Sequence, residues 1–190
     1  MNAQTLGNIK TYCVQKYSAS RGRRHDVEHV QRVRNNAFAI LKALDVGSVD
    51  KDMLEALCYL HDIPMCEASR GTILSHAFVH VFEKSIIKKR IFSLIEQFRL
   101  TVEEKKILMT AMINHPYSIP YRCLNKQSDM YSKILQDADS LDYVSPIREH
   151  QFKEAHPTLS WAAGMYLSFI RTHIGWFLNY PELLHSGRMY

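Results

Sequence analysis

The stretch Leu57-Cys58-Tyr59-Leu60-His61-Asp62 decides how this chain is interpreted, because an apolar helical run ends there in two adjacent polar side chains. An unpaired charge at the end of a buried helix would cost several kcal/mol in desolvation. A divalent metal offsets that cost, since imidazole and carboxylate both bind mid-row cations well. His61 and Asp62 are therefore the first candidates for a metal site, although a His-Asp dipeptide alone is a weak signal.

Two further blocks supply the context that the dipeptide lacks. Upstream lies His25-Asp26-Val27-Glu28-His29-Val30-Gln31-Arg32-Val33, and downstream lies Leu135-Gln136-Asp137-Ala138-Asp139-Ser140-Leu141-Asp142. Together with Leu60-His61-Asp62-Ile63, these blocks resemble the HD-domain superfamily of metal-dependent phosphohydrolases in their order, spacing and apolar flanks. The resemblance extends from about residue 23 to about residue 146. It implies a helical fold with a metal site and leaves the substrate open, because the superfamily hosts many reactions.

The resemblance also implies which residues hold the metal and carry catalysis. The family's first histidine stands just before x-x-Arg-Val, which is His29 here, and its final aspartate stands in Ala-Asp-x-Leu, which is Asp139. With His61 and Asp62 they provide two imidazoles and two carboxylates. Asp137 is the alternative to Asp139; residues two apart lie roughly 200° around a helix, so both should not share one ion. Without a thiolate, this set favours Mn²⁺, Fe²⁺, Co²⁺ or Mg²⁺ over structural Zn²⁺.

A second ion is a further expectation from the resemblance. In dinuclear HD proteins two more histidines lie between the His-Asp pair and the final aspartate, and His76 and His115 stand in comparable positions. His80 lies one helical turn from His76 and is an alternative to it. Surface or capping roles for these histidines stay open, so we expect one ion and allow for two.

Candidates for substrate binding lie near the motif blocks. His25 is four residues before His29, on the same face of the predicted helix, and is either a substrate-facing group or a helix cap. Arg32 either contacts phosphate or forms a structural ion pair, and we prefer the ion pair. Further candidate anchors are Lys84, Lys88, Arg122 and Arg148. Residues that follow the last ligand and are expected to shape the pocket are Asp142, Tyr143 and Glu149.

One position departs from the family pattern. Where many relatives continue His-Asp-Ile-Gly, this chain has Pro64. We therefore expect the loop over residues 64–74 to be particular to this protein.

Composition and charge bound the class of protein. The chain has 190 residues, of which 46% are hydrophobic and 23% charged, and this composition suits one globular domain. The net charge is +5 and the isoelectric point about 9.0. The basic clusters Arg21-Gly22-Arg23-Arg24 and Lys88-Lys89-Arg90 are either solvated surface or attract anionic substrates such as nucleotides. Nucleic acid is an unsupported alternative, because aromatic residues do not interleave with the basic ones.

Cysteines and terminal residues indicate the compartment. The first residues lack the apolar core of a signal peptide, and no later run approaches the length of a membrane span. The chain's cysteines show no C-x-x-C spacing; they are Cys13, Cys58, Cys66 and Cys123. We expect a cytoplasmic protein with reduced thiols, in which Cys13 and Cys58 fill the core.

Apolar residues recur at helical spacing almost throughout, and no long segment alternates as a half-buried strand does. The pattern predicts helices over 5–16 and 26–44, then one that runs past Met53 into His61 and Asp62, where Pro64 should stop it. Ser75 should cap a helix that reaches about Phe98. Later helices should start at Thr101, Asp129 and Thr158, the last continuing to Phe177. We expect a single all-α HD domain over 1–190, with the motif-bearing core over 23–146 and C-terminal helices over 147–190.

These observations predict a metal-dependent phosphohydrolase that acts on a phosphate ester or anhydride, with a nucleotide as the favoured small-molecule substrate. One alternative is a mixed-valent di-iron oxygenase of the same superfamily, with the ligand set His29, His61, Asp62, His76 or His80, His115 and Asp139. The other is a non-enzymatic HD-like regulatory or binding module. The intact ligand set argues against that module, because a vestigial site has no reason to retain buried charges.

Overall fold

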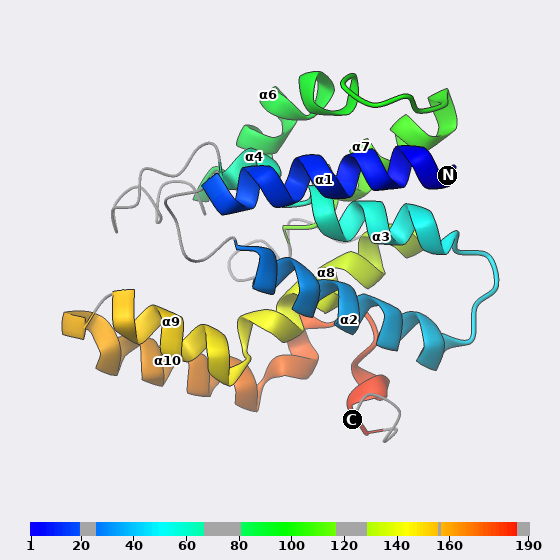
Figure 1. Cartoon of the computed structure of the whole chain (residues 1–190). Helices are drawn as coiled ribbons and strands as arrows, with labels where there is room; N and C mark the ends of the chain where they lie inside the picture. Colours follow the sequence, from blue (N-terminus) through cyan, green and yellow to red (C-terminus); the bar gives the residue numbers. More distant parts are fainter. Residues whose placement is uncertain (20–25, 67–80, 117–128, 156, 186–190) are drawn as a thin grey trace.

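All regular structure in the described part of the chain is helical (Figure 1). The computed structural model describes residues 1–19, 26–66, 81–116, 129–155 and 157–185. With η for 3-10 helices, the elements are α1 (Ala3–Ala19), α2 (Val27–Leu44), α3 (Lys51–Leu60), α4 (Ile63–Cys66), α6 (Glu83–Ile95), α7 (Val102–Asn114), α8 (Met130–Tyr143), α9 (Pro146–Ala155), η2 (Pro157–Leu159), α10 (Ser160–Thr172), η3 (Ile174–Phe177) and η4 (Pro181–His185). They pack into one domain, which confirms the predicted all-α class. No described helix is long and apolar enough to cross a membrane.

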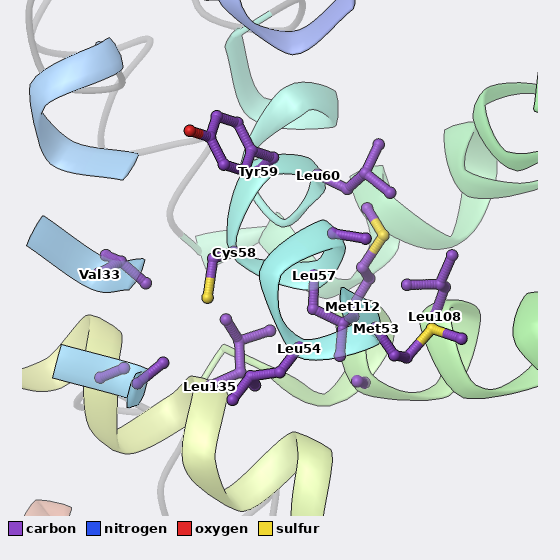
Figure 2. Packing of buried hydrophobic residues seen from close by; sticks show 14 of the residues in the cluster. Val33, Met53, Leu54, Leu57, Cys58, Tyr59, Leu60, Leu108, Met112 and Leu135 are labelled. Atoms are coloured by element: carbon purple, nitrogen blue, oxygen red, sulfur yellow. The ribbon is translucent and has the colours of Figure 1, made fainter. Parts of the chain in front are cut away.

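Helix α3 lies at the centre of the core and contacts α1, α2, α7 and α8. Every residue from Met53 to Leu60 is buried, and Glu55, the charged residue among them, pairs with Lys10 and Arg34. Figure 2 shows its side chains packed among Val33 of α2, Met112 of α7 and Leu135 of α8. Cys58 belongs to this core, as predicted, and burial raises the pKa of its thiol to about 12.

Three helices start next to the residues that were predicted to open them. Asp26 caps α2 by accepting the backbone N–H of His29 at 2.7 Å. Thr101 and Glu104 form a reciprocal capping box at the start of α7, and Asp129 caps α8. Each cap satisfies a backbone N–H that has no partner within its own helix.

Pro64 does not stop α3, contrary to expectation. The helix ends at Leu60, His61 and Asp62 form a turn, and Pro64 is the second residue of the short helix α4. Proline is tolerated there because first-turn residues need no hydrogen bond from their backbone nitrogen. Asp62 is thereby placed between two helices, and its backbone carbonyl accepts the N–H groups of Met65 and Cys66.

Other helix ends also differ from expectation. Helix α1 is longer than predicted, and α6 ends at Ile95 instead of Phe98. The predicted start of α6 at Ser75 lies outside the described residues. The single last helix predicted from Thr158 to Phe177 is divided into η2, α10 and η3. Gly175, a poor helix former, lies within η3, beyond the end of α10.

Helices α9 and α10 run side by side at one end of the molecule (Figure 1). The guanidinium of Arg171 on α10 contacts both the end of α8 and α9. Its Nε donates to the Val144 carbonyl at 2.9 Å, and its Nη1 lies 2.5 Å from the Glu149 carboxylate. These two contacts hold α9, which follows the block that contains Asp139 and Asp142, against α10.

Truncating one buried side chain of α3 tests this account of the core. Leu57 is 0% exposed, so Leu57→Ala should lower the free energy of unfolding by about 2–5 kcal/mol, measured by urea denaturation. Val102 is 84% exposed, and Val102→Ala should change it by less than about 0.5 kcal/mol. Equal effects of the two substitutions would contradict the central position of α3.

Candidate metal centre

Three buried histidines from three helices converge on one point. His29 lies in the first turn of α2, His61 directly follows α3 and His115 directly follows α7. Their rings are 1% exposed or less. The Nε2 atoms of His29 and His61 are 3.3 Å apart, and the ring centroids of His61 and His115 are 5.2 Å apart. The structure therefore brings together three histidines that are far apart in the sequence.

Hydrogen bonds from Nδ1 fix the orientation of the His61 and His115 rings. Nδ1 of His61 donates to the carbonyl of Cys58 at 2.8 Å, and Nδ1 of His115 donates to the carbonyl of Met112 at 2.8 Å. A carbonyl only accepts, so each Nδ1 carries the proton and the neutral ring has its lone pair on Nε2. Each acceptor lies three residues earlier, in the last turn of the preceding helix. Imidazoles held this way are typical of metal ligands.

Asp62 lies between the histidines, with its two oxygens facing different partners. Oδ2 is 3.0 Å from Nε2 of His29 and 3.3 Å from Nε2 of His61. Oδ1 is 3.7 Å from Nε2 of His115. The residue is 4% exposed, so its charge has little access to water. This carboxylate is able to bridge two adjacent cation positions.

The two aspartates of the downstream block point to different places. Oδ1 of Asp139 lies 3.6 Å from Nε2 of His29, which places this carboxylate beside the converging histidines. Asp137 instead accepts the backbone N–H groups of Asn179 and Tyr180 at 2.7 and 3.0 Å. The structure thus brings Asp139 to the cluster and uses Asp137 to hold the C-terminal segment against α8.

Asp142 is the partner of His29 on the side away from the cluster. Its Oδ2 is 2.6 Å from Nδ1 of His29, and its carboxylate also accepts from Nε of Arg32 and lies 3.3 Å from Nε of Arg148. Burial alone would raise the pKa of Asp142, but the bond from His29 and the two guanidinium groups lower it to about 2. Arg32 therefore forms the structural ion pair that the sequence favoured.

The same contacts act on His29. Burial and the Arg148 guanidinium lower the pKa of this imidazole, but hydrogen bonds to Asp142 and Asp62 outweigh them and raise it to about 9. In the protein without bound ions, a proton on His29 thus compensates the surrounding carboxylates. A divalent cation would take over that role.

Glu83 is part of the cluster and was missed from the sequence. It lies in the first turn of α6, is 8% exposed, and its Oε1 lies 3.2 Å from Nε2 of His115. A glutamate at the start of a helix is common on protein surfaces, so the local sequence carried no signal of its burial. Nε2 of His115 makes no hydrogen bond within the described structure. Burial lowers the pKa of His115, but Asp62 and Glu83 raise it well above its usual range.

The remaining candidates are less informative. His25, His76, His80 and Arg122 lie outside the described residues. Lys84 follows Glu83 on α6 and is half-buried, and burial together with Lys88 lowers its pKa.

Tyr143 packs edge-on against Tyr166, and Glu149 pairs with Lys153 and Arg171. Among the described anchor candidates, Arg148 contacts Asp142, the partner of His29.

The described donors form two overlapping groups of metal-ligating type. One comprises His29, His61 and Asp139, and the other His61, Asp62 and His115; within each group the donor atoms lie within 4.8 Å of one another. The groups share His61, and Asp62 contacts both. Such a concentration of inward-facing lone pairs and carboxylates in a buried region fits divalent cations.

Comparison with solved structures finds a similar fold in a protein from Lactobacillus plantarum, whose crystal structure was determined as a Northeast Structural Genomics target. The chains share 21% identity with a TM-score of 0.57, over 83% of this chain and 64% of that one. This chain thus matches less than two thirds of that protein's length, and the likeness concerns the fold alone. No family model and no curated protein matches the chain.

The raised pKa of His29 predicts that the metal-free protein loses stability as pH rises. The imidazole binds its proton more tightly in the folded state, so this contribution is complete below about pH 6.5 and is lost as pH rises through about 9. The loss should be on the order of 3 kcal/mol. Urea unfolding in EDTA from pH 6 to 9.5 measures it, and His29→Gln should have a flatter profile. Parallel profiles for the two proteins would contradict the assignment.

Proposed function

We propose that the protein is a metal-dependent phosphohydrolase of the HD type, which hydrolyses a phosphate ester or anhydride of a small molecule, with a nucleotide as the favoured substrate. The observation that carries the proposal is the convergence of His29, His61 and Asp62, with Asp139 beside them, at the positions that the HD motifs imply. These residues come from α2, the turn after α3, and α8, so sequence proximity does not explain their meeting.

The donor set suits a resident cation of the Mn²⁺, Fe²⁺, Co²⁺ or Mg²⁺ class, held by His29, His61, Asp62 and Asp139. The fit rests on the orientation of the two imidazoles. Nδ1 of His29 binds Asp142 and Nδ1 of His61 binds the Cys58 carbonyl, so both Nε2 atoms face the cluster. When bound, such a cation supplies Lewis acidity, which polarises a phosphoryl oxygen and lowers the pKa of water.

The chain's own residues contribute orientation and charge. Asp142 holds the His29 ring through Nδ1, and Arg32 and Arg148 offset the charge of that buried carboxylate. Arg148, whose side chain is 13% exposed, stays a candidate for contact with a phosphoryl group, because a guanidinium binds phosphate oxygens well. In the reaction, water forms a new P–O bond as the P–O bond to the leaving group breaks, and the leaving oxygen takes a proton.

Two other functions use the same cluster. A di-iron oxygenase would need iron and oxygen, and a non-enzymatic module would need neither. Against the module, the structure buries Asp62, His61 and His115 together at the centre of the fold, an arrangement that is costly without a compensating cation.

Phosphate release under anaerobic conditions tests the reaction class. The purified protein should release phosphate from at least one of a panel of nucleoside mono-, di- and triphosphates with Mn²⁺ or Mg²⁺ and without oxygen, because phosphoryl transfer needs only Lewis acidity. Asp139→Asn should weaken Mn²⁺ binding by about tenfold or more, whereas the matched change Asp137→Asn should leave it nearly unchanged. Iron-dependent oxygen uptake with no phosphate release would favour the oxygenase, and no turnover in either assay would favour the module.

We further propose that a second cation is held by Asp62, His115 and Glu83. His115 contributes an inward Nε2 that makes no described hydrogen bond, Glu83 places a carboxylate oxygen 3.2 Å from it, and Asp62 turns its Oδ1 toward the same atom. Glu83 adds a carboxylate to the predicted pair His76 and His115, of which His76 lies outside the described residues.

Metal stoichiometry tests the second position. Wild-type protein dialysed against Mn²⁺ should hold two ions per chain by mass spectrometry of the metal, and Glu83→Gln about one, because a carboxylate ligand is lost. Glu55→Gln is the matched control: Glu55 is 9% exposed, like Glu83, but pairs with Lys10 and Arg34 instead. One ion in the wild type, or an equal loss in both variants, would exclude a second site that depends on Glu83.

A further inference from the structure

Helix α10 turns a row of large apolar side chains toward solvent. Trp161, Met165 and Phe169 recur every four residues, so they lie along one side of the helix, and all three are exposed. Leu167 and Ile170, on the other side, are buried. Figure 1 shows α10 at one end of the molecule, beside α9. An outward helix face of this kind indicates an interaction surface.

Ring contacts extend this face beyond the end of α10. The centroid of the His173 ring lies 4.5 Å from that of Phe169 and 4.3 Å from that of Trp176. We define the α10 face as Trp161, Met165, Phe169, His173 and Trp176.

The exposed area of the α10 face is large for a monomer. Its tryptophans, Met165 and Phe169 are between 46% and 69% exposed. With about 150–250 Å² of surface on each aromatic side chain, these residues expose roughly 500 Å² together. That area is near the upper end for the largest apolar patch on a typical monomer. It is also more than half of the roughly 800 Å² that each partner buries in a standard interface.

Charge narrows the kind of partner. Residues 160–170 contain no charged side chain, and Arg171, the charged residue of α10, contacts Glu149 and the Val144 carbonyl. The acidic and basic residues of α9 are equal in number: Arg148, Lys153, Glu149 and Glu154. Anionic membranes and nucleic acids attract surfaces rich in lysine and arginine. A neutral face of aromatic and methionine side chains instead resembles the core of a protein interface.

The order of side chains on the α10 face suits a second copy of the same face. In a two-fold symmetric dimer, one surface serves both copies. If the helices are antiparallel and the axis passes at Met165, Trp161 of one copy meets Phe169 of the other, because each stands four residues from Met165. The two Met165 side chains then meet at the axis, between aromatic rings, and the methionine sulfur packs favourably against such rings.

We propose that the α10 face binds a second copy of this chain, in a two-fold symmetric, antiparallel pairing centred on Met165. The pairing does not depend on the proposed hydrolase activity, because none of the residues of the α10 face belongs to the metal centre.

Sedimentation equilibrium of the full-length protein measures the pairing. The wild-type protein should approach twice the monomer mass as its concentration rises. Met165→Glu should weaken dimerisation about tenfold or more, since it places two like charges against each other at the axis. Phe92→Glu is the matched control, because Phe92 on α6 is 63% exposed, close to the 67% of Met165. It should dimerise as the wild type does.

Mixing two charged variants tests the symmetry. Met165→Lys should lose dimerisation as Met165→Glu does. An equimolar mixture of the two should recover dimers, because opposite charges then meet at the axis.

Tryptophan emission provides a readout at the surface itself. The chain has 2 tryptophans, Trp161 and Trp176, and both belong to the α10 face. As wild-type protein is concentrated, their emission maximum should move to shorter wavelength because the rings leave water. Met165→Glu should not show this shift.

Phe169→Glu provides a second variant in case Met165→Glu does not fold, as judged by far-UV circular dichroism, and it should weaken dimerisation to a similar extent. A wild type that stays monomeric at every concentration would overturn the pairing. Equal loss in Phe92→Glu, or no recovery in the mixture, would also overturn it. A shift of the emission of monomeric wild-type protein on addition of phosphatidylcholine vesicles would assign the face to a lipid surface instead.

Discussion

The hydrogen bond between His29 and Asp142 joins α2 to α8, and the geometry of the candidate centre depends on it. Asp142 is held from the outside by Arg32 and Arg148, and it turns the His29 ring so that Nε2 faces His61 and Asp62. That buried carboxylate holds the imidazole at Nδ1, and Asp62 contacts its Nε2, at the point where the two helices meet. The pair thus has a structural role in the fold and an orienting role in the site.

Around this bond, the protein concentrates charges that a core normally excludes. Asp62, Asp142 and Glu83 are all buried, and each lies beside an imidazole or a guanidinium. The neighbouring carboxylates raise the pKa values of His29 and His115, so protons on these imidazoles balance part of the negative charge in the metal-free protein. A divalent cation bound at these donors would compete with those protons, so its affinity would depend on pH.

Much of the fold follows from local signals. Asp26, Thr101 and Asp129 cap helices that were predicted to start at these residues. Pro64 was misassigned because proline both ends helices and starts them, and only the turn at His61 and Asp62 distinguishes the two. The division of the last helix was also missed, since its apolar spacing continues through the break.

The sequence by itself determined the helical class, the capped starts, and the candidate ligands that the HD motifs mark, because these depend on residues within about one helical turn of one another. Only the tertiary structure decided which groups meet. It directed Asp139 to the histidines and Asp137 to Asn179, and it brought Glu83 to His115. His29 and Asp142 are 113 positions apart, so no local sequence pattern encodes their contact. The packing of α2 against α8, beside the apolar α3, brings the two residues together.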